Sequence, residues 1–512
     1  MNLRLCGSVL TIGVVLISSS ARGQRVAPLP PPCLVPGVAT APIGVRPQLR
    51  PASLVVLPLA VGAGAAPFLY LSDGVPSAIA QRIGSAIPRL YVVGRQAQRR
   101  RAADRTAIRT LGSELGVGFV LGGSLGGTRA DVRMTFSLYD ATTGKKTWTR
   151  TFLYDSAGAL PIEQSVSVEV ASRIVGPATP SELEALLHVP TQRHAAYEAM
   201  LRGDVAAVEY AGSLAAEAYR RAVQIDPRFA EAHAKLALID AEVLDDNDVN
   251  SQVEATQLAR EVRAATDRAI SLDSTSATAW LAVARSWVLE GRPAADWTQA
   301  FARAIAHDST NPAILAAFGN ALAQTNERAR AHALLERASA LDPGKAELWT
   351  SLAELAVAEK RDVDACGLLN RAILEDALYA PAWALRAIVR GRHDDLRFAW
   401  ADAETAERLG STLLGESAAA LIDLTARDTV RARERLTILW QDVRDRKSVS
   451  AHEGRAVAVA LLAAGDNSRA LDVLESVRPL GPRYAASLLD SNFDRLRNEP
   501  RFRALVSNKS KS

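Results

Sequence analysis

The chain has 512 residues, of which 48% are hydrophobic and 23% are charged, a composition typical of globular proteins. This length allows about three domains, each able to bury a sizeable core. A formal net charge of +4 does not by itself indicate a nucleic-acid partner, and three cysteines are too few for a disulfide-rich scaffold.

The first segment, residues 1–23, has the features of a secretory signal. Arg4 supplies a positive charge, Val9 to Ile17 are apolar, and the small residues from Ser18 to Gly23 suit a cleavage site. The apolar run is shorter than the ~20 residues that a membrane-spanning helix needs. We therefore expect an exported protein of the periplasm or cell envelope, with no transmembrane helix after signal removal. The alternative is an uncleaved anchor in the inner membrane.

Residues 24–51 are rich in proline and poor in large apolar side chains. This composition predicts an extended, poorly ordered linker. Cys33 lies in this segment, and Cys366 directly follows a small helix-packing residue, Ala365. We expect Cys366 to take part in helix packing.

The segment 52–176 changes to an alternation of strands and helices. Apolar runs predict strands at 54–57, 90–93, 119–121, 132–139 and 148–154, and helical patterns cover 75–87, 105–115 and 162–174. Strands that alternate with helices and end in a hairpin indicate a small α/β sandwich.

Gly122-Gly123-Ser124-Leu125-Gly126 matches the G-x-S-x-G pattern of a serine hydrolase elbow. That elbow requires a helix after the serine. Here a strand, residues 132–139, follows instead. We interpret the glycines as a hairpin bend between strands, and an enzyme would have to use Ser124 or a site that the sequence does not reveal.

From Arg221 to Gly410 a short phrase of the form Arg-Ala-x-x-x-Asp recurs. Its closing residues are Asp226, Asp273, Asp308, Asp342 and Asp376, with steps of 47, 35, 34 and 34 residues. A period near 34 residues is typical of stacked helix pairs, none of which can bury its apolar face alone.

Large and small side chains recur at fixed offsets within this period. Seven residues after the closing aspartate stands a large residue in four of five cases, with His233 as the exception; the four are Trp280, Leu315, Trp349 and Trp383. Small residues follow at Ala237, Ala284, Gly319 and Ala353, and the second helices carry Tyr219, Phe301, Leu335 and Leu369. This pattern resembles the tetratricopeptide repeat (TPR). The resemblance implies a mainly α protein, a right-handed superhelix of helix pairs, that binds other proteins.

Helical patterns continue beyond Gly410 at 411–426, 429–445, 451–462 and 468–477, so we assign residues 190–480 to helical repeats. Residues 481–512 are predicted to form a capping segment and tail, because terminal repeats must cover an open end. We expect the outer repeats to be irregular at His233, Arg386 and Arg390.

A second resemblance covers both globular parts. Ser72-Asp73-Gly74, the run Glu114–Ser124, the run Leu138–Gly144 and the closing run Asp490–Phe502 are similar to proteins that place a TolB-N-terminal-like α/β domain before a TPR array. In that family the α/β domain often follows an adenylate cyclase, kinase or winged-helix module. The resemblance implies assembly or regulatory roles and provides no catalytic residues.

Two sets of residues are candidates for binding a partner. The first set would line the concave face of the solenoid: Glu231, Arg285, Asn320, Gln324, Glu347, Thr350, Glu354 and Arg392. Their mixed charges favour an internal segment or a folded partner over a C-terminal carboxylate. The second set is a basic cluster that acidic groups could meet: Arg95, Arg99, Arg100, Arg101 and Arg105.

The sequence therefore favours a non-enzymatic scaffold of the cell envelope that binds protein partners through a TPR groove. No metal or cofactor site is predicted, because the histidines are scattered and no Cys-x-x-Cys occurs. The alternative is a membrane-anchored regulator that faces the cytoplasm, of the kind otherwise fused to cyclase, kinase or winged-helix modules.

Overall fold

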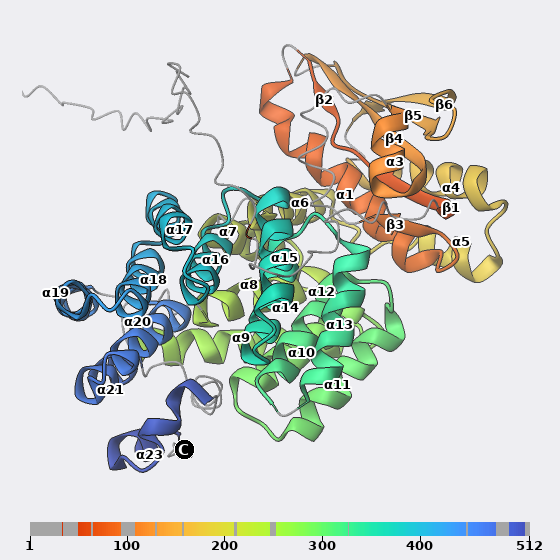
Figure 1. The fold of residues 1–512 in the computed structure, drawn as a ribbon. Coiled ribbons are helices and arrows are strands. Elements are labelled where there is room, and N and C mark those ends of the chain that lie inside the picture. Colours follow the sequence, from red (N-terminus) through yellow and green to blue (C-terminus); the bar gives the residue numbers. More distant parts are fainter. Residues whose placement is uncertain are drawn as a thin grey trace, which may run out of the picture.

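The computed structural model describes residues 33, 50–62, 65–93, 108–128, 131–155, 158–208, 212–245, 252–325, 327–446, 449–477 and 491–506. An α/β unit at the N-terminal side adjoins a long curved stack of helices (Figure 1). The predicted signal, most of the proline-rich linker and the basic cluster lie outside the described residues.

The α/β unit is built on a mixed sheet. Its strands are β1 (Arg50–Val56), β2 (Ala60–Val61), β3 (Tyr91–Val93), β4 (Val117–Thr128), β5 (Asp131–Asp140) and β6 (Lys146–Tyr154). The order is β3-β1-β4-β5-β6, with β2 paired to β4. The pairs β1/β3, β1/β4 and β2/β4 are parallel, and the meander β4-β5-β6 is antiparallel. The predicted strands and closing hairpin are confirmed.

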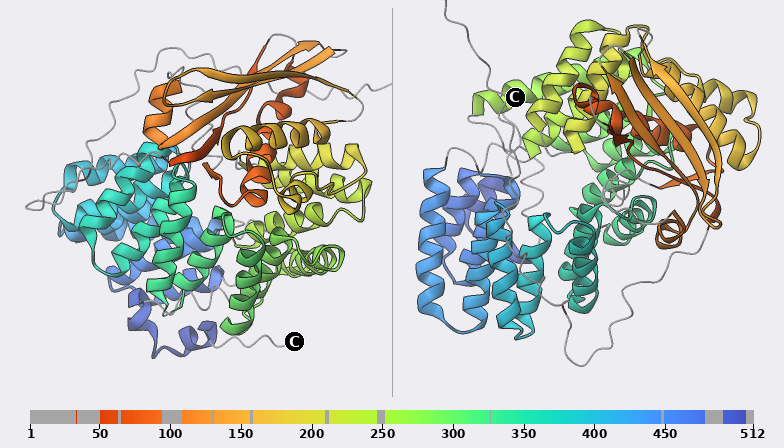
Figure 2. Two further views of the ribbon diagram at one scale, coloured as in Figure 1. Left: turned by 90° about the vertical axis from the view of Figure 1, so that its right-hand side faces the viewer. Right: turned by 90° about the horizontal axis from the view of Figure 1, so that it is seen from above.

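Helices cover both faces of this sheet. Because side chains alternate along a strand, Leu54 and Val56 of β1 share a core with α1 (Leu69–Ala86) and α4 (Leu160–Val175). Val55, between them, belongs to a second core with α3 (Ile108–Leu115). Figure 2 shows the curved sheet with α1 and α4 packed beneath it.

The interpretation of the glycine run after Leu121 as a hairpin bend is wrong. Residues 122–127 lie inside β4 and pair with β5 over their whole length. A Cβ atom at Gly123 would lie 1.9 Å from the carbonyl oxygen of Thr135, so glycine here allows two strands to approach closely. The chain reverses further on, between Thr128 and Asp131.

Paired antiparallel helices follow the α/β unit. They are α6 (His194–Val208) with α7 (Gly212–Ile225), α8 (Ala230–Asp245) with α9 (Gln252–Leu272), α10 (Ala277–Leu289) with α11 (Ala294–His307), α12 (Pro312–Ala323) with α13 (Arg328–Leu341), α14 (Ala346–Ala358) with α15 (Asp362–Glu375), α16 (Ala380–Arg392) with α17 (Leu396–Arg408), α18 (Thr412–Thr425) with α19 (Thr429–Asp445), and α20 (Ala451–Ala463) with α21 (Asn467–Ser476). The chain is thus a TPR-type α-solenoid preceded by a small α/β domain. None of the described helices is long and apolar enough to cross a membrane.

The large and small positions of the repeat interlock as predicted. A Cβ atom at Gly319 would lie 2.8 Å from Cγ of Leu335, which shows how closely α12 and α13 approach. The equivalent alanines, Ala284 and Ala353, are fully buried. Because apolar side chains are buried between neighbouring pairs, the stack has the stability that a single pair lacks.

The recurring aspartates terminate the second helix of a pair and shape the turn to the next. Oδ1 of Asp273 accepts a hydrogen bond from the backbone N–H of Thr275 at 2.8 Å. The backbone N–H two residues after the aspartate makes the same hydrogen bond to Asp226, Asp308 and Asp376. Such side-chain turns hold the backbone where a helix cannot continue.

The large residue seven positions after the aspartate closes this turn. The indole N–H of Trp280 donates to the carbonyl of Ser274 at 2.8 Å, and Trp349 and Trp383 make the equivalent bond. His233 is not an exception in this respect, because its Nε2 lies 3.2 Å from the equivalent carbonyl of Pro227. The arginine of the following phrase lies over the indole ring in two repeats of the described residues: Arg303 is 4.5 Å from the Trp280 ring centre and Arg371 is 5.7 Å from that of Trp349.

Both ends of the solenoid are closed. At its start, Tyr197 and Met200 of α6 belong to the same continuous core as the α/β unit. At its end, η3 (Ser491–Leu496) and α23 (Pro500–Val506) pack on α20 and α21, where the stacked rings of Phe493 and Phe502 are buried. Within the described residues, these two elements thus cover the apolar face of the last helix pair, and the assignment of 481–512 as a capping segment stays a prediction.

Candidate partner-binding surface

The first helices of successive pairs, here called the A helices, form a continuous row. The row comprises α8, α10, α12, α14, α16, α18 and α20, each in contact with the next. Two of the predicted groove residues bridge neighbouring A helices. Glu231 on α8 accepts a hydrogen bond from Thr278 on α10 at 3.2 Å, and Arg285 on α10 pairs with Glu242 on α8 at 2.9 Å.

The remaining groove candidates differ in how far they reach solvent. Glu354 is exposed, and Arg392 is exposed while pairing with Asp362 at 3.3 Å. Asn320, Gln324 and Glu347 are half-buried. Thr350 is only 3% exposed and donates to the carbonyl of Ala346, so its side chain does not form part of the surface. The accessible A-helix face therefore presents both signs of charge.

The α/β unit contacts the solenoid at its turns rather than at the predicted groove residues. The hydroxyl of Thr310, in the turn before α12, donates to the carbonyl of Gly84 at 3.0 Å. The hydroxyl of Tyr91 donates to the carbonyl of Ala340 at the end of α13. The α/β unit is thus tied to the third and fourth pairs in addition to the first.

The joint between the α/β unit and α6 contains buried polar groups. Glu163 of α4 is fully buried, accepts a hydrogen bond from Tyr197 of α6, and lies 3.9 Å from the guanidinium of Arg82 of α1. Burial raises the pKa of Glu163 to about 8, although Tyr197 and Arg82 both oppose the shift. The Arg82 guanidinium also donates to the carbonyls of Leu186 and His188.

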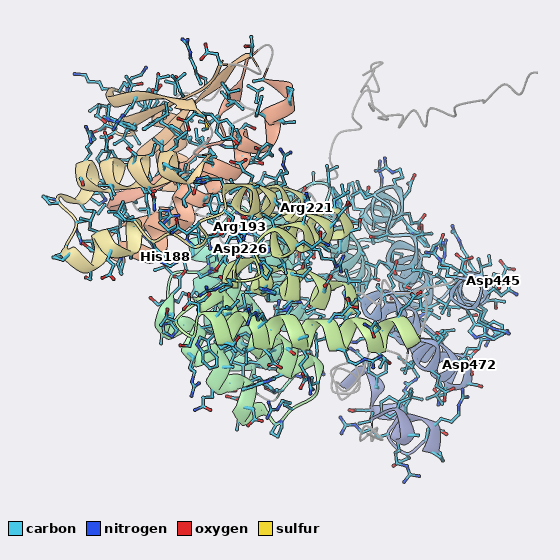
Figure 3. The ribbon with its side chains drawn as sticks, turned by 180° about the vertical axis from the view of Figure 1, so that it is seen from behind. His188, Arg193, Arg221, Asp226, Asp445 and Asp472 are labelled. Atoms are coloured by element: carbon cyan, nitrogen blue, oxygen red, sulfur yellow. A yellow bond between two sulfur atoms is a disulfide. The ribbon has the colours of Figure 1, made fainter. Side chains whose placement is uncertain are left out.

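A second set of contacts ties the first repeat to the preceding loop. Asp226 accepts hydrogen bonds from the Thr191 hydroxyl and from the backbone of Arg228. Burial opposes ionisation of Asp226, but these bonds and the charge of Arg193 hold its pKa below the ordinary value. Figure 3 shows Arg193 and Asp226 together at this joint, with Asp445 and Asp472 at the far end of the solenoid.

A shallow hollow lies between the fourth and fifth helix pairs. Its volume is about 270 Å³, and it is lined by His332, Glu336, Ser339, Ala340, Trp349, Leu352 and Leu368. Pockets for small molecules usually measure 300–1,000 Å³ and enclose most of their ligand. The hollow therefore suits one or two side chains of a partner better than a cofactor.

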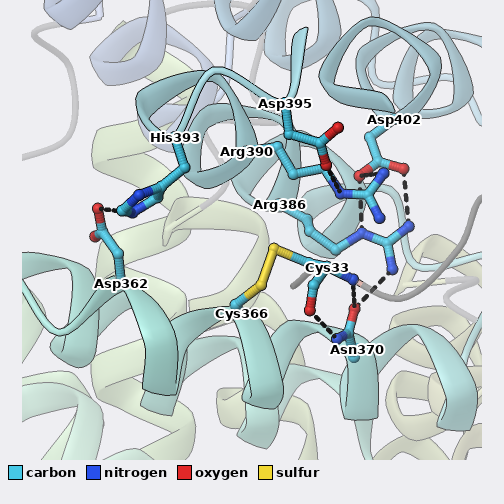
Figure 4. Close-up of a disulfide and its surroundings, with 9 residues drawn as sticks. All are labelled: Cys33, Asp362, Cys366, Asn370, Arg386, Arg390, His393, Asp395 and Asp402. Atoms are coloured by element: carbon cyan, nitrogen blue, oxygen red, sulfur yellow. Dashed lines mark hydrogen bonds and ion pairs between the residues drawn. A yellow bond between two sulfur atoms is a disulfide. The ribbon is translucent and has the colours of Figure 1, made fainter. Parts of the chain in front are cut away.

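A disulfide joins Cys33 to Cys366 on α15, with Cα atoms 5.5 Å apart (Figure 4). The expectation that Cys366 serves helix packing is incomplete: it is fully buried, but it is bonded to a residue 333 positions away. The expectation of a poorly ordered linker is wrong at Cys33, which is 2% exposed. The amide of Asn370 holds both backbone groups of Cys33.

Arg386 and Arg390, where the chain departs from the TPR pattern, belong to the same buried cluster. Arg386 makes two 2.8 Å hydrogen bonds to the carboxylate of Asp402, and Arg390 lies 3.3 Å from that carboxylate. Burial raises the pKa of Asp402 and lowers that of Arg390, while each partner charge opposes the shift. The irregularity at these positions is therefore a paired set of buried charges (Figure 4).

The structure also locates the residues considered for catalysis. Ser124 lies within β4, where it pairs with Thr135, so the strand continues past it and no helix follows directly. That arrangement lacks the strand–turn–helix geometry of a hydrolase elbow. Among the described residues, no group of three His, Cys, Asp or Glu side chains is placed to hold a metal ion.

Comparison with known proteins gives limited matches. No family model matches the chain. It is 27% identical over 209 residues to a putative adenylate cyclase 3 of Rhizobium meliloti, a match that covers 40% of this chain and 35% of the relative. The chain thus spans about a third of the length of the curated relative it matches.

Several solved structures are similar over the helical part. PilF of Pseudomonas aeruginosa is 16% identical, with 42% of this chain and 93% of that chain covered and a TM-score of 0.35. Yeast Tom70 is 14% identical, with coverage of 68% and 82% and a TM-score of 0.37. The TPR protein YrrB is 17% identical, with coverage of 39% and 96% and a TM-score of 0.27. Because these scores are low, the fold assignment rests on the helix pairs themselves.

Proposed function

We propose that this chain is a non-enzymatic scaffold that binds a protein partner along the A-helix face. The observation that carries the proposal is the continuous row of A helices from α8 to α20, which presents an extended surface rather than a closed cavity. Glu354 and Arg392 place opposite charges on this surface. A row of mixed charge suits an internal segment or folded partner better than a terminal carboxylate.

The proposed compartment is the cell envelope. The buried Cys33–Cys366 disulfide supports this proposal, because structural disulfides persist in oxidising compartments and are rare in the cytosol. The signal-like residues 1–23 support it independently. The likeness of the N-terminal unit to TolB-N-terminal domains remains a prediction, consistent with its mixed sheet and covering helices.

The second candidate is a regulator anchored in the inner membrane and facing the cytoplasm. The similarity to part of a putative adenylate cyclase favours it, because the same repeat region would then serve a regulatory partner. N-terminal sequencing of the protein from its native cells distinguishes the two. A start near Gln24 removes the anchor and supports export, whereas an intact N-terminus with reduced cysteines supports the regulator.

The proposed binding face is tested by comparing two charge-reversal variants in quantitative affinity capture from native cells. Glu354→Arg lies on the A-helix face of α14, and Asp364→Arg is a matched exposed change on α15 of the same pair. We expect Glu354→Arg to reduce capture of the partner at least fivefold, while Asp364→Arg leaves it unchanged. Equal loss in both variants, or no loss in either, would contradict the proposed face.

A further inference from the structure

The side chain of Asn370 holds a segment of backbone that is remote in sequence. The N–H of Cys33 donates to Oδ1 of Asn370 at 2.9 Å, and Nδ2 of Asn370 donates to the carbonyl of Cys33 at 3.1 Å. A planar amide that bonds to both the N–H and C=O of one residue takes the place of a neighbouring strand. These bonds depend on the backbone of the bound segment and not on its side chain.

The amide of Asn370 is held in position by buried charges. Arg386 donates to Oδ1 of Asn370 at 3.0 Å, and the Arg386 guanidinium is itself fixed by two bonds to Asp402. Oδ1 thus accepts two donors, and only this orientation of the amide leaves Nδ2 to bond the Cys33 carbonyl. Arg386 and Asp402 are 2% and 0% exposed, so water does not compete for them.

Small side chains surround the place where Cys33 lies. The buried cluster that contains Cys33 and Cys366 is rich in alanine: Ala346, Ala353, Ala356, Ala365, Ala372, Ala382, Ala384 and Ala406. Alanines leave room for Cys33 beside the packed helices, and Trp383 in the same cluster supplies a large apolar side chain. Figure 4 shows Cys33 lying beside α15 with its backbone facing Asn370.

We propose that Asn370, Arg386 and Cys366 form a recognition site for the backbone of a peptide, which this chain fills with its own Cys33. The disulfide then locks a ligand that the site already binds without it. A residue that takes the place of Cys33 needs a small or thiol-bearing side chain, because Cys33 is 2% exposed and lies in a cluster rich in alanine. This proposal does not depend on the A-helix face, which lies on other residues.

Occupation of the site by a tethered segment has a consequence for competing ligands. A tethered segment has an effective concentration of about a millimolar or more, so a free segment of equal intrinsic affinity competes poorly with it. Reduction by a dithiol, which is itself oxidised to a disulfide, leaves two thiols on Cys33 and Cys366. The site then holds its segment by non-covalent contacts alone and becomes open to exchange.

The experiment uses the full chain with a protease site replacing residues 40–45, cleaved after folding and oxidation. Dithiothreitol then reduces the disulfide, and gel filtration separates any released N-terminal fragment. The probe is a fluorescent peptide of residues 28–38 carrying Cys33→Ser, followed by fluorescence anisotropy. We expect saturable binding to the cleaved, reduced protein. If the N-terminal fragment stays bound after reduction, that result also shows binding. The fraction of fragment that is retained is then compared between the parent and the variants.

The decisive comparison is between variants of the site and a matched control. We expect Asn370→Ala to weaken binding at least tenfold, because two backbone hydrogen bonds are lost. Asn370→Asp keeps the acceptor for Arg386, which supports a normally folded protein, but it places a carboxylate oxygen against the Cys33 carbonyl oxygen, so we expect a loss of binding at least as large. Asn498→Ala, an exposed change between η3 and α23, should leave binding unchanged. Absence of saturable binding, or equal affinity in Asn370→Asp, Asn370→Ala and the parent, would overturn the proposal.

Discussion

Substitution of Glu163 by glutamine should change how the stability of the α/β joint depends on pH. Glu163 is fully buried between α1, α4 and α6, with Tyr197 donating to it and Arg82 3.9 Å away. The carboxylates of Glu198 and Asp204 on α6 add to the burial that raises its pKa. Glutamine has nearly the same shape and still accepts the Tyr197 hydrogen bond, but it does not ionise.

The sign and size of the effect follow from proton linkage. Burial raises the pKa of Glu163 from 4.5 in the unfolded chain to about 8, so between these values the folded state binds a proton that the unfolded state has lost. Stability is therefore greatest below the unfolded pKa and falls as the pH rises toward 8. A pKa difference of that size lowers the free energy of unfolding by about 5 kcal/mol between pH 4.5 and pH 8.

The assay is urea unfolding of parent and variant from pH 5 to pH 9, followed by circular dichroism. Glu163→Gln should match the parent within about 1 kcal/mol at pH 5 and become progressively more stable than the parent toward pH 9. Glu217→Gln, an exposed change on α7, is the control and should follow the parent. If the free energies of unfolding of Glu163→Gln and the parent differed by the same amount at every pH, the reasoning would be refuted.

Three further substitutions and one matched control test the packing of the solenoid by thermal unfolding. Arg386→Ala leaves the Asp402 carboxylate without its two principal hydrogen bonds, and we expect a loss of about 3–5 kcal/mol. At Gly203 a Cβ atom would lie 2.4 Å from the Tyr219 ring, so Gly203→Ala should cost about 1–3 kcal/mol, whereas Gly212→Ala, with open space around it, should be neutral or slightly stabilising. Trp349→Phe loses the indole hydrogen bond that closes the turn and should cost about 1 kcal/mol, and an unchanged melting temperature would contradict that role.

The repeats were predictable from sequence because their packing is local. The spacing of Trp349, Leu352 and Ala353 relative to the aspartates specifies one helix pair, and each pair packs on its neighbour. Asp273 and the indole of Trp280 act on the same turn within a few residues. A periodic sequence therefore carries most of the information that the solenoid needs.

The errors concern contacts between distant segments. Cys33 and Cys366 are 333 residues apart, and no spacing rule connects a cysteine in a proline-rich segment to one in a helix. The glycines after Leu121 resemble a bend, but β5 approaches so closely that β4 has no room for a Cβ atom at Gly123 or Gly127. One signal was present but was interpreted only as an irregular repeat: the charged Arg386 and Arg390 stand where the repeat expects apolar residues, and a buried charge needs a partner, which for Arg386 is Asp402.

The most direct test of the scaffold function places a photo-crosslinking amino acid at single positions of the full chain in native cells. At position 354, on the A-helix face, we predict a crosslink to one protein partner in at least severalfold excess over position 364 on α15 of the same pair. Mass spectrometry of the crosslinked peptides identifies the contact. Equal crosslinking at the two positions, or crosslinks confined to position 364, would contradict binding through the A-helix face.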